Sequence, residues 1–78
     1  SLGYEFVFIA LQKQKFNDVG IDNKILLKKT AEGSLRNWMV KSKIVALIIR
    51  PDKYIFGSAA NEKNVKALVS HFYDLYRL

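Results

Sequence analysis

The chain has no cysteine, one histidine and one proline among its 78 residues. Without cysteine it can form no disulfide, no zinc–thiolate site and no redox CxxC pair. His71 alone cannot build a histidine-rich metal site, and the four glycines stand too far apart for the GxGxxG turn that binds a dinucleotide phosphate. These absences exclude redox, metal and dinucleotide chemistry of the common kinds, and we assign no catalytic, cofactor-binding or metal-binding residue to this chain.

Long apolar runs are also missing. No apolar segment approaches the ~20 residues that cross a bilayer, and residues 6–11 are too short and too close to Glu5 to be the core of a signal peptide. We expect a cytoplasmic protein without membrane contact. The chain starts at Ser1-Leu2 without an initiating methionine and enters an apolar segment almost at once, which indicates an excised piece of a longer protein.

The remaining composition is that of a folded domain, with 50% hydrophobic, 13% aromatic and 26% charged residues. A chain of this length buries only about 60% of its unfolded surface, so it can hold one small core but hardly a deep substrate cleft as well. We find no internal repeat, low-complexity tract or linker. Residues 1–78 are therefore expected to form a single domain.

The net charge of +6 is concentrated in the middle of the chain. Residues 24–50 carry seven basic residues against Glu32 alone, whereas the two flanking parts nearly balance. Five lysines of this segment form the constellation that could bind a phosphate backbone: Lys24, Lys28, Lys29, Lys41 and Lys43. Such segments are more often solvated faces of folded domains, so we favour that interpretation and keep nucleic-acid binding by a small basic α+β domain as the alternative.

The first third of the chain contains two strand candidates. Residues 4–11 form a nearly continuous apolar run of strand-forming types, typical of a strand covered on both faces. Residues 25–30 are a weaker candidate that includes Lys28 and Lys29. Between them, residues 12–23 are polar with isolated apolar positions, and a short helix or an irregular connection both fit this pattern.

A short helix is expected next. Ser34 is a residue type that caps helices, and Leu35, Trp38 and Met39 follow at helical spacing, so the pattern predicts a helix that ends near Ser42. A parallel crossover between strands through this helix would be right-handed.

A β-hairpin is predicted after that helix. Residues 44–49 are the most apolar stretch of the chain and the best candidate for a central strand, and residues 54–59 form a second strand. Pro51 and Asp52 suit the two central positions of a type I turn. A three-residue loop would then place Lys53 in the left-handed region, with positive φ.

The last element is an amphipathic helix capped by Asn61. Its apolar face repeats at helical spacing: Val65, Leu68, Val69, Phe72 and Tyr76. We expect Tyr73 and one further aromatic residue to be exposed. His71 has Asp74 three residues away but no nucleophile within reach, so we interpret it as a surface histidine.

Together these elements predict an α/β fold, in which helices pack on a mixed sheet of about four strands that closes with a β-hairpin. The order strand, helix, hairpin, helix is that of the closing half of a thioredoxin-like sheet.

An apolar strand runs into Arg50-Pro51-Asp52, and after Lys53 come Tyr54-Ile55-Phe56, a short link and a terminal amphipathic helix. This pattern resembles the C-terminal thioredoxin-like domain of the flavin-dependent aromatic hydroxylases, of the phenol hydroxylase and 3-(3-hydroxyphenyl)propionate hydroxylase type. The resemblance extends more loosely upstream, through Leu35 and Trp38 to the strand at residues 6–11. The family often has glycine where this chain has Lys53, and the lysine-rich middle is not a family feature. The following residues carry the resemblance: Leu47, Ile48, Ile49, Arg50, Pro51, Asp52, Tyr54, Ile55 and Phe56.

The resemblance implies a non-catalytic module. In these enzymes larger N-terminal domains hold FAD, NAD(P)H and the aromatic substrate, and the C-terminal domain lacks the redox cysteines of true thioredoxins. We therefore expect this chain to pack on the catalytic FAD-binding domain of its parent and to contribute to subunit association, with a homodimer as one outcome. Arg50 and Asp52 could either latch onto a neighbouring domain or serve only their own turn.

Overall fold

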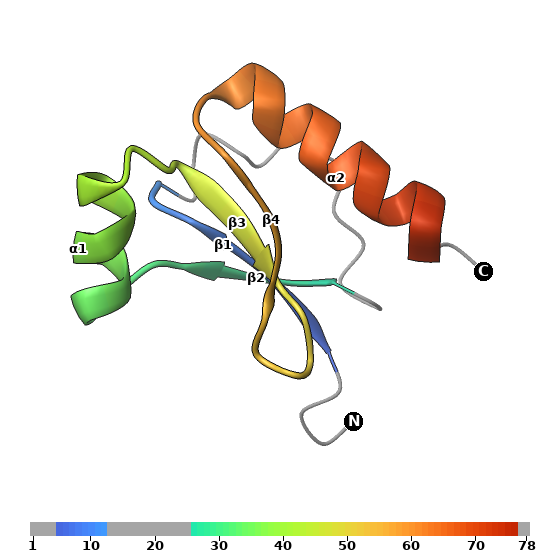
Figure 1. Ribbon diagram of the computed structural model, residues 1–78, viewed down its shortest axis with the longest axis horizontal. Helices are drawn as coiled ribbons and strands as arrows, with labels where there is room; N and C mark the ends of the chain where they lie inside the picture. The colour runs from blue at the N-terminus through green and yellow to red at the C-terminus, as the bar shows by residue number, and fades with distance from the viewer. Residues whose placement is uncertain (1–4, 13–25, 77–78) are drawn as a thin grey trace.

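The computed structural model describes residues 5–12 and 26–76. The expectations for Tyr4, for Ile25 and for the connection at residues 13–23 fall outside these residues. The expected strands and the two expected helices are present to within two residues at each end. They are β1 Phe6–Ala10, β2 Leu26–Thr30, α1 Gly33–Lys41, β3 Ala46–Ile49, β4 Ile55–Ala59 and α2 Glu62–Tyr76 (Figure 1).

The four described strands form one mixed sheet in the order β2-β1-β3-β4. β1 pairs with β2 in parallel, while β3 runs antiparallel to β1 and to β4. The predicted mixed sheet and closing hairpin are thus confirmed, but the parallel crossover through α1 was wrong. β2 and β3, which flank α1, lie on either side of β1 and run in opposite directions, so the parallel pair is β1 and β2 instead.

The helices lie on opposite faces of the sheet (Figure 1), and each face has its own apolar core. Alternating side chains of β1 serve both cores, because Phe8 and Ala10 pack toward α2 while Ile9 packs toward Met39 of α1. β1 is therefore covered on both faces, as its continuous apolar run predicted. β3 lies between β1 and β4, and Leu47 is fully buried, which confirms the prediction of a central strand.

The register of the hairpin shifts inside β4. Ile48 lies opposite Gly57 and Ile49 lies opposite Ile55, so Phe56 is an extra residue, a β-bulge. The bulge turns Phe56 toward α2, where its ring centroid lies 5.6 Å from that of Phe72. Ile55 is left on the other face of the sheet, 49% exposed.

The N-termini of the two helices differ from each other. Asn61 caps α2 as predicted, since the backbone N–H of Asn64 donates to Asn61 Oδ1 at 2.9 Å. The prediction of Ser34 as the cap of α1 was wrong, because the N-cap is Glu32, whose side chain makes no capping hydrogen bond. The Arg36 N–H donates to the Glu32 carbonyl, so the helical hydrogen bonds begin at Glu32, and Gly33 has φ of 59°, a left-handed value that glycine adopts without strain.

The exposure of the aromatic residues also differs in part from expectation. Tyr73, expected at the surface, is buried with its ring 5.3 Å from Phe72. Trp38 is 43% exposed and Tyr76 is 38% exposed, although both lie at helical spacing with buried residues. The face of α2 that packs on the sheet is therefore rotated toward Tyr73 and away from Tyr76. In the nine-residue α1, Met39 is the only fully buried side chain.

Candidate functional site

The turn that carries the family resemblance has the predicted geometry. The Lys53 N–H donates to the Arg50 carbonyl at 2.9 Å, and the Arg50 N–H donates to the Tyr54 carbonyl at 2.7 Å. Lys53 has φ of 76°, which confirms the predicted left-handed residue. Pro51 and Asp52 therefore occupy the centre of a three-residue hairpin loop, as their residue types indicated.

The side chains of this turn hold one another in place. Arg50 Nη2 donates to Asp52 Oδ2, and Asp52 Oδ1 accepts a hydrogen bond from the Tyr54 N–H at 3.3 Å. The guanidinium carbon of Arg50 lies 5.8 Å from the centroid of the Tyr54 ring, within range of a cation–π interaction. Asp52 thus serves its own turn.

The same turn is nevertheless presented to the outside. The side chains of Arg50 and Asp52 are both about half exposed, and Tyr54 is 69% exposed. An exposed ion pair of this kind contributes at most about 1 kcal/mol to folding stability. Tyrosine and arginine are the residue types enriched where proteins bind one another, so a rigid turn that presents both is suited to docking.

The lysines of the basic segment do not share one surface. Lys24 lies outside the described residues. Lys28 and Lys29 are neighbours on β2 and point to opposite faces of the sheet, since Lys28 is in register with Phe8 and Lys29 with Ile9. Lys41 and Lys43 lie at the C-terminal end of α1, where cations interact favourably with the helix dipole.

Lys43 has a structural role that the sequence did not reveal. Its φ is 59°, and its N–H donates to the Val40 carbonyl while the Ile44 N–H donates to the Met39 carbonyl. This pair of bonds is the Schellman motif that ends helices, and glycine is its usual residue at the left-handed position. Because lysine stands there, the sequence contained no signal for the motif.

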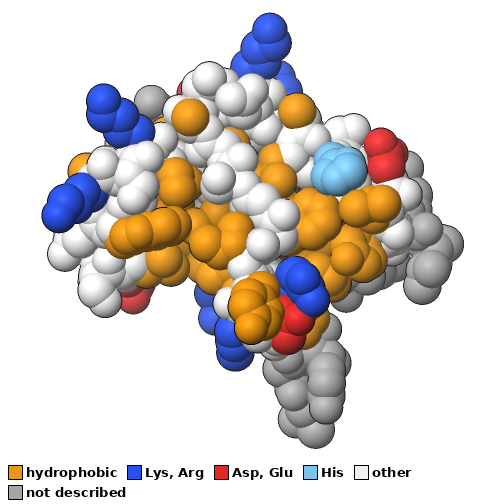
Figure 2. All heavy atoms as spheres, viewed as in Figure 1, with side chains coloured by type: hydrophobic (Ala, Val, Ile, Leu, Met, Phe, Trp, Pro, Cys, Tyr) orange, Lys and Arg blue, Asp and Glu red, His pale blue; other side chains and the backbone are white. Residues whose placement is uncertain are grey.

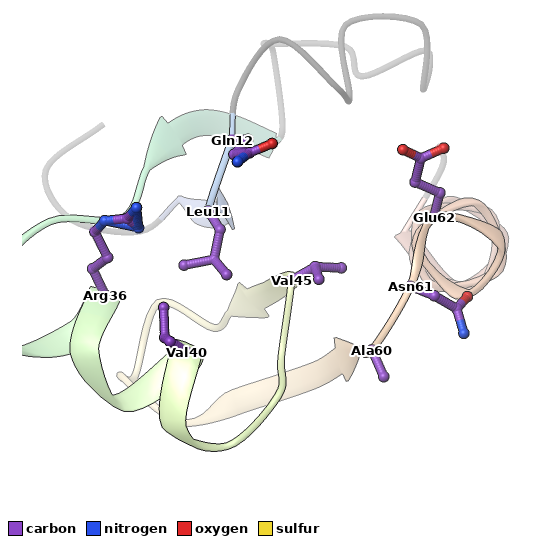
Figure 3. Close-up of a pocket in the computed structure, with 8 residues that line it drawn as sticks. All are labelled: Leu11, Gln12, Arg36, Val40, Val45, Ala60, Asn61 and Glu62. Carbon is purple, nitrogen blue, oxygen red and sulfur yellow. The ribbon is translucent and has the colours of Figure 1, made fainter.

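A cavity of about 470 Å³, which the sequence analysis did not predict, opens at the end of the sheet where β1 and β4 finish and β3 begins (Figure 3). Two charged side chains line it from opposite sides, Arg36 from α1 and Glu62 from the start of α2. The Asn61 amide, also in its wall, already accepts the capping hydrogen bond of α2. The rest of the wall is mainly apolar: Leu11, Val40, Val45 and Ala60, with Gln12 at the margin.

The acidic residues and His71 of the described part of the chain do not come together in one metal-binding group. Over residues 5–12 and 26–76 there is no group of three or more His, Cys, Asp or Glu side chains that could hold a metal ion. His71 is exposed on α2, with its ring 5.7 Å from that of Phe56, a contact that makes it part of the packing against β4. No helix in the described part of the chain is long and apolar enough to cross a membrane.

Comparisons with protein-family models, with curated proteins and with solved structures found no match to this chain.

Proposed function

We propose that this chain is a non-catalytic, thioredoxin-like module of a cytoplasmic FAD-dependent aromatic hydroxylase, and that it acts in domain packing and subunit association. The observation that carries the proposal is the Arg50-Pro51-Asp52 turn followed by Tyr54, held rigid by the left-handed Lys53 and presented at the tip of the hairpin. This turn is the part of the chain in which the resemblance to the hydroxylases is most specific.

The sheet supports a thioredoxin-like fold. The order β2-β1-β3-β4, with a parallel first pair and β3 antiparallel to its neighbours, is a mixed sheet that closes with a hairpin, as the proposed fold requires. A helix on each face completes the three layers (Figure 1). The order of elements from β2 to α2, namely strand, helix, hairpin and helix, agrees with the closing half of that fold.

The module would leave the redox chemistry to the rest of the enzyme. Among the described residues there is no glycine-rich turn at a helix N-terminus, which an FAD or NAD(P)H pyrophosphate requires. The cavity beside Arg36 and Glu62 offers one cation and one anion, a poor match to a dinucleotide with two phosphates. FAD and NAD(P)H would therefore bind in the catalytic body, and this chain would supply a packing surface.

The experiment uses the complete reading frame from which the chain derives. The purified product should carry FAD, seen in its visible absorption spectrum, and should oxidise NAD(P)H when a phenolic compound is added. A deletion of the part corresponding to residues 1–78 should keep the FAD but lose thermal stability and subunit association. A product without flavin would overturn the family assignment, and a deletion that changes neither stability nor association would overturn the packing role.

Nucleic-acid binding remains the second candidate, because the net charge of the described residues lies in one segment. Residues 29–53 hold six basic and two acidic side chains, whereas the other described residues hold three of each. Binding to phosphates would fall steeply between about 50 mM and about 200 mM salt. Fluorescence anisotropy with labelled single- and double-stranded DNA and RNA should show no such binding if the chain is a packing module.

A further inference from the structure

The two edges of the described sheet are protected unequally. β2 forms one edge and carries Lys28 and Lys29, charges of the kind that discourage pairing with another strand. β4 forms the other edge, and residues 55–59 contain no charged side chain. An uncharged edge strand offers its free backbone N–H and C=O groups to a further strand.

The surroundings of β4 are apolar as well. Ile55, which the bulge leaves on the α1 side, is half exposed, and Ser58 on the same side is exposed and polar but uncharged. β4 lies at the front of the sheet in the view of Figure 1, and in the same view Figure 2 shows hydrophobic side chains on both sides of the strand, toward α1 and toward α2. Lysine and arginine side chains lie at the margins of this face (Figure 2). An apolar centre with a charged rim is the usual anatomy of a protein interface.

The charges at the two ends of β4 indicate which strand would pair with it. Lys53 precedes the strand and Glu62 follows it, and both side chains are exposed. If a second copy pairs antiparallel through the same edge with Ser58 opposite Ser58, and Phe56 is not counted because it is the extra residue of the bulge, Glu62 of the second copy falls opposite Lys53 of the first copy. The two-fold axis then produces the same contact a second time, so the edge is complementary to itself.

We propose that β4 pairs antiparallel with β4 of a second copy of this chain, about a two-fold axis at Ser58, to form a continuous eight-stranded sheet. This inference rests on the subunit-association part of the proposed function and names its surface, but it requires no flavin-binding body. The bulge at Phe56 limits the regular pairing to the part of β4 beyond it, and the flanking apolar side chains supply the remaining contact.

The test is sedimentation equilibrium of the full chain over a range of concentrations, with two matched serine-to-lysine variants. Ser58→Lys places like charges across the two-fold axis and should raise the dimer dissociation constant by about tenfold or more. Ser70→Lys is the control. Ser70 is exposed and lies two residues after Leu68, about 200° around the helix from the side chain that contacts Gly57, so it faces away from β4.

A charge exchange tests the orientation. Lys53→Glu should weaken the dimer, and the double variant with Glu62→Lys should restore it, because the opposite charges are exchanged between the two ends of the strand. Far-UV circular dichroism checks that each variant is folded. A chain that stays monomeric at every concentration, or a dimer that Ser58→Lys and Ser70→Lys affect equally, overturns the proposal. If the β4 edge is covered by another domain of a longer parent protein, and not by a second copy of this chain, the dimer proposal is overturned. The proposed function, a packing module, would still stand in that case.

Discussion

At the scale of single residues, two lysines stand where glycine is the ordinary choice. Lys43 ends α1 with φ of 59°, and Lys53 ends the hairpin loop with φ of 76°. A side chain with a Cβ atom is strained in this region, whereas glycine is not. Only one of the two positions was predictable. The Pro51-Asp52 pair specifies the turn and therefore Lys53, whereas the predicted helix end near Ser42 gave no sign of a left-handed residue at Lys43.

Replacing Lys53 by glycine should raise the free energy of unfolding by roughly 0.5–1 kcal/mol. Glycine relieves the backbone strain of the folded state, and this gain is partly offset because glycine also increases the conformational entropy of the unfolded chain. Urea denaturation followed by circular dichroism measures it. Lys53→Ala is the matched control, since it removes the same side chain and keeps the Cβ. An equal gain in both variants would mean that the lysine charge, and not the backbone, is responsible.

Replacing Asn61 by alanine should lower the free energy of unfolding by about 1 kcal/mol, because the Asn64 N–H loses the side-chain oxygen that accepts its hydrogen bond. The control is Asn64→Ala, the same exchange three residues later. There the backbone N–H is retained, and alanine favours the helix, so this variant should be neutral or slightly stabilised. Equal losses in the two variants would show that Asn61 does not cap α2.

At the scale of elements, the β-bulge decides which side chains of β4 reach the core. It directs Phe56 onto a group of rings at the C-terminal end of α2, and the centroid of the Phe6 ring lies 4.9 Å from that of Phe72. Gly57 belongs to the same contact, since a Cβ there would come within 2.7 Å of Leu68. The sequence predicted the strand but not the bulge, because alternation along residues 54–59 is equally compatible with either of the two faces.

Truncating neighbouring residues measures the effect of this bulge. Phe56→Ala should lower the free energy of unfolding by roughly 2–4 kcal/mol, because it removes a ring packed against Phe72. Ile55→Ala, one residue earlier, should cost less than about 1 kcal/mol in the isolated monomer, because Ile55 is half exposed. Chemical denaturation at low protein concentration compares the two. A larger loss for Ile55→Ala would mean that β4 pairs without the bulge.

At the scale of the whole molecule, the local patterns and the tertiary contacts were predictable to different extents. The apolar runs, the turn residues and the helical spacing of α2 each depend on neighbours in the chain, and they located the described strands and both helices. Pairing depends on residues far apart. β1 is apolar on both faces and could pair in either direction on either side, so its parallel contact with β2 required the structure.

The candidate sites divide in the same way. The Arg50–Tyr54 turn is local, and its geometry was predicted from three residues. The cavity between Arg36 and Glu62 is lined from five elements or the residues next to them, and the burial of Tyr73 depends on how α2 lies on the sheet, so neither had a sequence signal. The lysine side chains of the basic segment do not form one patch, because Lys28 and Lys29 are adjacent on a strand and their side chains must point to opposite faces of the sheet.

The central claim is that this chain is a packing module of a larger flavin enzyme. The most direct measurement is the nucleotide sequence of its gene upstream of the codon for Ser1. We predict that the same reading frame continues upstream into an FAD-binding region with a GxGxxG turn between a strand and a helix. A reading frame that starts close to Ser1, with no such region before it, would contradict the account.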